Sequence, residues 1–179
     1  MRYRELNGVI ADSVSKLIAM QRMYANNKDK LDYLHDVILD TERNVIIFYQ
    51  YDLHCDLLKK LCKEMKKEIF VINGKEKHFP EKDYNGKNSV TMVQVQAGGS
   101  GIELTYAPIA IFFSPTYSYQ DYVQCLGRNN RIGSKVQSEV YLFRTKGLEE
   151  YIYSCLENKQ DFAEKKYIEN SKEYEGLPY

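Results

Sequence analysis

Two short stretches of this sequence combine residue types suited to binding phosphate. The first reads QAGGSGIELT (residues 96–105), and the second reads QCLGRNNRIG (residues 124–133) with arginines at Arg128 and Arg131. Glycine lets a backbone approach an anion closely, and guanidinium groups offer permanent charge and forked hydrogen-bond donors. Both stretches therefore indicate a phosphate-binding site.

The glycine-rich stretch follows a predicted strand over residues 89–95. A helix is expected after it, so that the stretch becomes a strand-to-helix turn whose amides form a nest for a phosphate oxygen. These amides belong to Gly98, Gly99, Ser100 and Gly101. A flexible turn without a ligand is the alternative, because a glycine cluster by itself is a weak signal.

The second stretch lies on a predicted helix over residues 119–129, with Ser118 as its cap. Gln124, Arg128 and Arg131 fall at positions i, i+4 and i+7, so they are expected to share one face. This pattern favours phosphate binding, and a solvated helix end with arginines near the carboxyl-terminal dipole is the alternative.

Gly127 lies inside this predicted helix. Glycine in a helix interior costs about 1 kcal/mol relative to alanine. That cost is tolerable if a ligand or another backbone must come close to Gly127.

The elements around these stretches follow from hydrophobic periodicity. Two opening helices are predicted, over residues 9–25 and 31–38. Five short apolar strands are predicted over residues 44–51, 68–74, 89–95, 108–114 and 138–145, with helices over 53–65, 119–129 and from 148 onward. Strands that alternate with helices predict an α/β fold with a parallel sheet covered on both faces.

Composition limits the function classes. The 25 basic and 25 acidic side chains give a formal net charge of zero, which excludes a strongly basic nucleic-acid binder. The four cysteines form no CxxC pair and the three histidines lie far apart, so no metal site or disulfide framework is expected. No apolar run approaches membrane-spanning length and no signal peptide is evident, so a cytoplasmic, reducing compartment without a membrane is expected.

In combination, the two stretches resemble motifs V and VI of the second RecA-like lobe of superfamily 2 helicases. Within that superfamily they are most similar to the Swi/Snf-like DNA translocases and their phage and bacterial relatives, whose patterns are AGGxGIxLT and QxxGRxxRIG. The resemblance covers residues 28–157. It implies a RecA-like parallel sheet with helices on both faces, preceded by a helical connector (residues 1–27) and followed by a charged tail (158–179).

The resemblance also implies roles for individual residues. Arg128 and Arg131 match the arginine fingers that reach the γ-phosphate of ATP, and Gln124 matches the glutamine that helps join the two lobes. Glu103 and Gly127 are expected near the nucleotide. The residues expected at the DNA backbone are Gly98, Gly99, Ser100, Gly101 and Thr105. Gln94, Gln96 and Ser134 depart from the family pattern.

An ATPase of this class also needs a GxxxxGK[ST] loop and a DExx acid pair. Neither motif occurs in this sequence. ATP and Mg²⁺ are therefore expected to be held mainly by an N-terminal RecA-like lobe, either in the same longer chain or in a separate polypeptide. The isolated chain is predicted to be inactive and to bind DNA weakly. The alternative function is a non-enzymatic RecA-like module that docks to a protein or nucleic acid.

Overall fold

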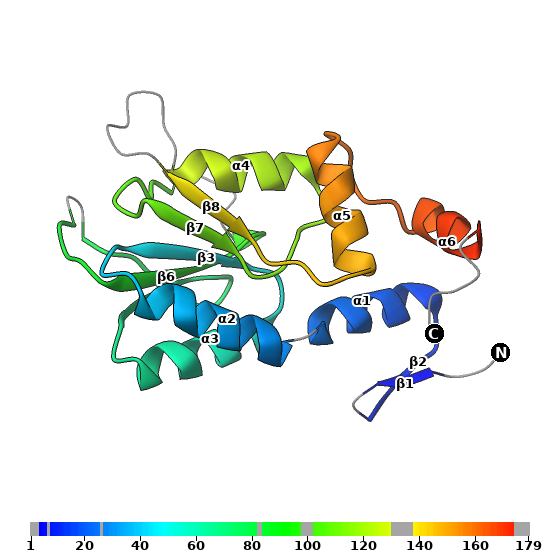
Figure 1. Ribbon diagram of the computed structural model, residues 1–179, viewed down its shortest axis with the longest axis horizontal. Helices are drawn as coiled ribbons and strands as arrows, with labels where there is room; N and C mark the ends of the chain where they lie inside the picture. Colours follow the sequence, from blue (N-terminus) through cyan, green and yellow to red (C-terminus); the bar gives the residue numbers. More distant parts are fainter. Residues whose placement is uncertain are drawn as a thin grey trace.

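A six-stranded sheet forms the centre of the protein (Figure 1). The computed structural model describes residues 4–6, 8–25, 27–81, 84–97, 102–129 and 138–173. Along the sheet the strand order is β5-β4-β6-β3-β7-β8. The strands are β3 (Val45–Tyr49), β4 (Glu68–Ile72), β5 (Lys77–His78), β6 (Ser89–Gln94), β7 (Ile109–Phe112) and β8 (Glu139–Leu142).

Within this six-stranded sheet, neighbouring strands are parallel except the pair β4 and β5. The central strand β3 pairs with β6 on one side and β7 on the other, so that Ile47 lies opposite both Met92 and Ile111. The α/β fold with a parallel sheet is confirmed. The antiparallel edge strand β5 was not predicted, because its two residues lie in a polar stretch without an apolar run.

The sheet divides the apolar core into two layers. Successive side chains of β3 point to opposite faces, as the strand period requires. Ile46 and Phe48 pack in one layer, and Val45, Ile47 and Tyr49 pack in the other. Because all five are fully or almost fully buried, β3 is the continuous apolar run expected of a strand covered on both sides.

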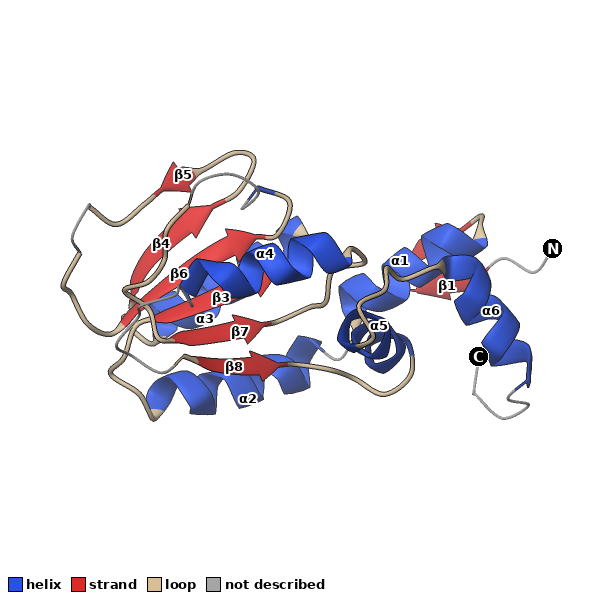
Figure 2. Ribbon diagram, turned by 90° about the horizontal axis from the view of Figure 1, so that it is seen from above, coloured by secondary structure: helices blue, strands red, loops and turns tan. Residues whose placement is uncertain are grey.

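Helices cover both faces of the sheet, as predicted (Figures 1 and 2). Helices α2 (Asn27–Leu39) and α3 (Asp52–Glu64) lie on one face, and α4 (Tyr119–Asn129) lies on the other. Beyond the carboxyl ends of the strands lie α1 (Val14–Tyr24), α5 (Leu148–Glu157) and α6 (Glu164–Glu173).

The prediction of a helix over residues 9–25 is wrong at its beginning. Residues Val9–Ala11 form strand β2, which pairs antiparallel with β1 (Arg4–Leu6), and α1 starts only at Val14. Gly8 adopts a φ of 77° between the two strands. The Asn-Gly dipeptide at positions 7 and 8 is the usual sequence signal for such a hairpin. The prediction extended the helical spacing of the later apolar residues back to Val9 and did not use this signal.

The carboxyl-terminal segment, a charged tail in the sequence, packs on the rest of the protein through aromatic residues. Most of its described part forms α6, but Phe162, just before that helix, is 8% exposed. The Phe162 ring stacks on Tyr117 at 4.5 Å, and Tyr167 of α6 lies 5.3 Å from Tyr151 of α5. Aromatic residues spaced among the charges therefore anchor this segment.

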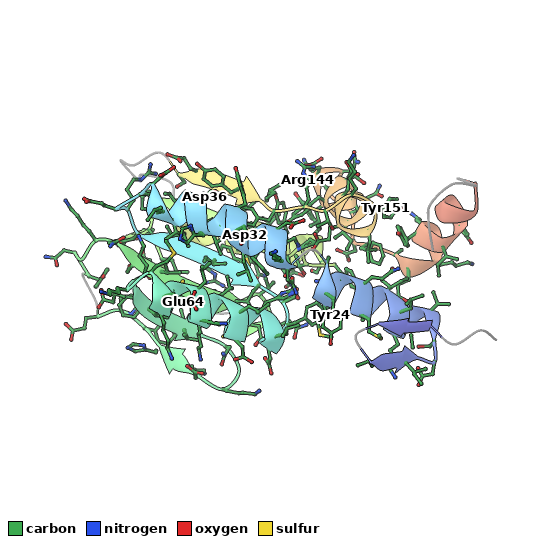
Figure 3. All side chains as sticks on the ribbon, turned by 60° about the horizontal axis from the view of Figure 1, so that its bottom comes forward. Tyr24, Asp32, Asp36, Glu64, Arg144 and Tyr151 are labelled. Atoms are coloured by element: carbon green, nitrogen blue, oxygen red, sulfur yellow. The ribbon has the colours of Figure 1, made fainter. Side chains whose placement is uncertain are left out.

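The face formed by α2 and α3 carries acidic side chains at its surface (Figure 3). Asp32 and Asp36 are exposed on α2, and Glu64 is exposed on α3. Exposed lysines lie on the same helices, with Lys28 on α2 and Lys60 and Lys63 on α3, so this face carries charges of both signs.

Candidate functional site

Helix α4 is built so that its last turn can carry functional side chains. Ser118 caps its start, since Ser118 Oγ accepts a hydrogen bond from the amide of Asp121 at 3.2 Å. Tyr122 packs against Phe112 of the sheet with ring centroids 5.1 Å apart, and Cys125 is 3% exposed. The apolar side of α4 is thereby fixed on the sheet, and its opposite side remains accessible.

Ser118 and Asp121 do not form a capping box. The amide of Ser118 donates instead to Thr116 Oγ1 at 3.3 Å. The Ser118 side chain therefore caps the helix, but Asp121 does not reciprocate.

Gln124 and Arg128 lie one helical turn apart on α4, and both are half-buried. Arg128 Nη1 donates a hydrogen bond to the carbonyl of Ile102 at 2.9 Å. In return, the amide of Leu104 donates to the carbonyl of Arg128 at 3.2 Å. The two stretches identified in the sequence therefore meet, and one of the predicted finger residues joins them.

The contact between the two stretches lies next to a buried thiol. Burial raises the pKa of Cys125 to about 12, and the positive charge of Arg128 opposes this shift. A thiol with such a pKa stays protonated at neutral pH, so Cys125 is a packing residue and not a nucleophile.

The residues after the glycine-rich stretch place Glu103 and Thr105 at the surface and bury Leu104 between them. The helix expected after the glycines is absent from the described residues 102–108, which turn and lead directly into β7. That expectation was wrong because the buried residues Leu104 and Ala107 belong to a turn and not to a helix. In this turn the amide of Ala107 donates to the carbonyl of Leu104 at 3.1 Å.

Several predicted residues lie outside the described part of the chain. These are the predicted nest residues Gly98, Gly99, Ser100 and Gly101, together with Arg131. Their roles stay predictions.

Gly127 has open space where a side chain would stand. A Cβ atom built at Gly127 meets no described atom beyond its own helix within 4 Å. Packing among the described residues therefore does not explain this glycine.

A buried polar cluster was not predicted from the sequence. It lies beyond the carboxyl ends of β3 and β7, and its members are Arg22, Lys30, His54, Ser114 and Glu149, all 6% exposed or less. Lys30 Nζ contacts Glu149 Oε1 at 2.6 Å and the carbonyl of Phe113 at 3.1 Å. Lys30 shares the helical spacing of Leu34 and Ile38, and a lysine on an apolar stripe is the signal that could have revealed the cluster.

The second half of the cluster centres on His54. Its Nε2 lies 3.0 Å from the carbonyl of Met23, and its Nδ1 lies 3.2 Å from Ser114 Oγ. Burial lowers the pKa of His54 to about 4. Burial also lowers the pKa of Lys30, although the contact with Glu149 opposes that shift. The cluster ties the opening helices and α5 to the sheet.

Within the described residues, no group of three or more metal-ligating side chains comes together. The same part of the chain contains no helix with the length and apolarity required to cross a bilayer.

Comparison with known proteins gives consistent matches. Residues 29–133 match the helicase conserved C-terminal domain. An uncharacterized ATP-dependent helicase of Mycoplasma pneumoniae is 31% identical over 86% of this chain, and the ISWI chromatin-remodeling complex ATPase ISW2 of Saccharomyces cerevisiae is 33% identical over 64%. The chain spans only 15% and 11% of these two relatives.

A solved structure supports the fold. The C-terminal part of the Fun30 ATPase domain superposes with a TM-score of 0.62 at 24% identity, over 77% of this chain and 47% of that chain. Residues 29–133, which match the helicase conserved C-terminal domain, contain both stretches that carry the predicted site. The resemblance to Swi/Snf-like translocases agrees with the match to ISW2, a chromatin-remodeling ATPase. The chain belongs to the helicase conserved C-terminal domain family and has the fold of the C-terminal, RecA-like lobe of Swi/Snf-like ATP-dependent helicases.

Proposed function

We propose that this chain is the second motor lobe of an ATP-dependent DNA helicase or translocase. Arg128 and Arg131 reach across to the γ-phosphate of ATP on an N-terminal lobe, and Gln124 helps hold the two lobes together. The backbone of residues 98–101 and the Thr105 side chain contact a phosphate of the DNA strand. Glu103 and Gly127 lie near the nucleotide.

The observation that carries this proposal is the bonding between the two motif segments. Arg128 donates to the carbonyl of Ile102, and the carbonyl of Arg128 accepts from Leu104. In a two-lobe motor, these bonds join the segment proposed to contact DNA to the helix proposed to contact ATP. A ligand that displaces one segment is therefore expected to displace the other as well.

The chemistry assigned to this chain is electrostatic. Mg²⁺ and the phosphates of ATP are held mainly by the N-terminal lobe, where the bond to the γ-phosphate is broken. A guanidinium group aimed at the transferring phosphoryl group stabilises charge that develops in the transition state. The hydrogen bond to Ile102 restricts the Arg128 side chain, so less conformational entropy is lost when it meets its target.

The test is steady-state ATP hydrolysis by the complete two-lobe protein at saturating DNA. Arg128→Ala and Arg131→Ala are each expected to lower kcat on the order of 10³-fold, the effect typical of arginine fingers. The matched control is Arg43→Ala, which removes an arginine that pairs at the surface with Glu139 at 2.7 Å. Wild-type turnover by both finger variants would rule out the proposed role.

The docking-module hypothesis gives a different result in the same experiment. If the chain only binds a partner, the arginine variants should weaken that binding and no DNA-stimulated hydrolysis should be found in the wild-type protein. Hydrolysis that is lost in the two variants and kept in Arg43→Ala excludes the docking module.

A further inference from the structure

The connection between β7 and α4 is held by residues from both ends of the described chain. At its centre is Tyr117, whose ring is contacted by Arg22 of α1 and by Phe162, which follows α5. The Arg22 guanidinium carbon lies 4.0 Å from the ring centroid of Tyr117. The Phe162 ring stacks on Tyr117 at 4.5 Å with an interplanar angle of 24°. Two groups this close cannot share one face of a ring, so Tyr117 lies between them.

Backbone hydrogen bonds reinforce the stack. Arg22 Nη2 donates to the carbonyl of Pro115, and the amide of Phe162 donates to the carbonyl of Tyr117 at 2.8 Å. Both bonds fix main-chain atoms just before α4. The path of the chain into α4 is therefore set by side chains and amides from distant parts of the sequence.

Asp161 makes a direct bond to the first residue of α4. The amide of Tyr119 donates to Asp161 Oδ1 at 2.7 Å. The first amides of a helix lack partners within the helix, and a carboxylate there is also favoured by the helix dipole. Asp161 thus adds a second cap to the one that Ser118 provides.

Helix α4 carries Gln124 and Arg128 on its later turns. A helix of 11 residues is stiff, so a displacement of its first turn also displaces its far end. We propose that Arg22, Tyr117, Asp161 and Phe162 are positioning residues that clamp the start of α4 and thereby aim Arg128 for ATP hydrolysis. This inference rests on the proposed motor function.

The clamp also links α4 to α1, which precedes the sheet in the chain. Arg22 is 4% exposed, and its Nε has no hydrogen-bond partner among the described residues. A buried guanidinium that leaves a donor unpaired is costly. A guanidinium at position 22 fits a role in holding this connection, because an apolar residue there could pack on Tyr117 but could not bind the Pro115 carbonyl.

The first measurement is amide hydrogen exchange in the complete two-lobe protein. Asp161→Ala is expected to speed exchange at the first turn of α4 by about fivefold, the scale of losing a helix cap. Asp161→Asn keeps an acceptor for the Tyr119 amide and should stay within about twofold of wild type. Gln160→Ala, at the exposed neighbouring position, is the matched control. Unchanged exchange in Asp161→Ala overturns the clamp.

The second measurement is ATP hydrolysis by the same proteins and by Phe162→Leu. Asp161→Ala and Phe162→Leu are expected to lower kcat by about tenfold, because a small misplacement of a catalytic group is enough to do so. The KM for ATP should stay unchanged, since the other lobe holds most of the nucleotide. Asp161→Asn should restore kcat.

The outcomes separate the clamp from the proposed motor function. If Arg128→Ala abolishes turnover while Asp161→Ala and Phe162→Leu keep wild-type kcat, the clamp does not position the arginine and the motor function stands. If Arg128→Ala and Arg131→Ala also keep wild-type turnover, the arginine-finger role fails, and the catalytic role of the clamp fails with it. If the wild-type two-lobe protein shows no DNA-stimulated hydrolysis, the motor function itself fails.

Discussion

The two polar regions of this lobe, the Lys30 and Glu149 pair and the last turn of α4, differ in how deeply their side chains are buried. Lys30 and Glu149 form a pair whose side chains are 6% and 1% exposed, and Glu149 also accepts two hydrogen bonds from Thr145 at 3.0 Å. At the last turn of α4, Arg128 is half-buried and Glu103 is exposed, and Gly127 leaves open space beside them. Lys30 and Glu149 are paired with each other within the chain, whereas the described residues at the end of α4 are more accessible to solvent.

This contrast separates stability from function. A buried charge that loses its partner is strongly destabilising, so the Lys30 and Glu149 region should control folding. Groups near solvent cost little to change, so the region around Arg128 should control activity with only small effects on folding.

The largest expected effect is on the buried ion pair. Glu149→Leu leaves Lys30 without its carboxylate and Thr145 without its acceptor, so the free energy of unfolding should fall by about 3–5 kcal/mol. Denaturant unfolding of the chain measures it. The double variant Lys30→Met with Glu149→Leu should recover part of the loss, because no unpaired charge then remains.

The control for this prediction is on the same helix. Glu157 of α5 lies 3.6 Å from Arg144, and both side chains are about half exposed, at 52% and 46%. Glu157→Ala should change the free energy of unfolding by no more than about 0.5 kcal/mol. Equal losses for Glu149→Leu and Glu157→Ala would mean that the buried pair contributes nothing special.

A smaller effect is expected from pH at His54. Its pKa is lowered from 6.5 to about 4 by burial, and the charges of Lys30 and Arg22 act in the same direction. Between these two pH values the unfolded chain binds a proton that the folded chain does not, so stability should fall as pH decreases from about 6.5 to about 4. The loss is on the order of 2–3 kcal/mol.

Unfolding at several pH values tests the His54 prediction. In His54→Gln, the decrease in stability over this pH interval should be smaller than in wild type by about the same 2–3 kcal/mol, since the titrating group is gone. The absolute stability of the variant does not enter this comparison, because each protein is compared with itself. A decrease of equal size in both proteins would show that other groups cause it.

Arg128 should affect stability less than either buried group. Arg128→Ala removes the hydrogen bond to the carbonyl of Ile102, and we expect a loss of about 1–2 kcal/mol in the free energy of unfolding. Arg43→Ala, which breaks a pair that is 44% exposed on both sides, should cost less than about 1 kcal/mol. A loss above about 4 kcal/mol for Arg128→Ala would place Arg128 with the buried cluster and break the separation.

The sequence predicted the elements of the sheet because the strands are continuous apolar runs. Residues 45–49 and 109–112 are buried on both faces, and Tyr119–Asn129 has the predicted bounds of α4. The contact between Arg128 and Ile102 could not be read from spacing, because 26 residues separate them and the chain between them forms β7. The family resemblance nevertheless pointed to both segments.

The buried cluster and the clamp were missed for a different physical reason. Arg22, Lys30 and His54 belong to types that are mostly or partly exposed in proteins, so composition rules place them at the surface. Their burial depends on partners such as Glu149, which lies 119 residues from Lys30. Helical spacing can mark Lys30 as a lysine on an apolar stripe, but it does not identify the distant partner that its burial requires.

The smallest expected effect concerns Gly127, and it has opposite signs for stability and activity. A methyl group at this position meets no described atom beyond the helix itself, and alanine is favoured over glycine in a helix interior. Gly127→Ala should therefore raise the free energy of unfolding by about 0.5–1 kcal/mol. If the space is kept for the other lobe or for ATP, the same change should lower kcat/KM of the two-lobe protein.

The measurement pairs denaturant unfolding of the chain with ATP hydrolysis by the two-lobe protein. Val123→Ala is the control, since Val123 is a 44% exposed residue of α4 one turn earlier, and its replacement should leave turnover unchanged. A more stable Gly127→Ala variant with normal turnover would mean that nothing approaches this glycine during catalysis. A more stable variant with impaired turnover would show that Gly127 lowers stability in favour of activity, which is the trade-off expected of a functional site. The Lys30 and Glu149 pair differs, because its expected contribution is to stability.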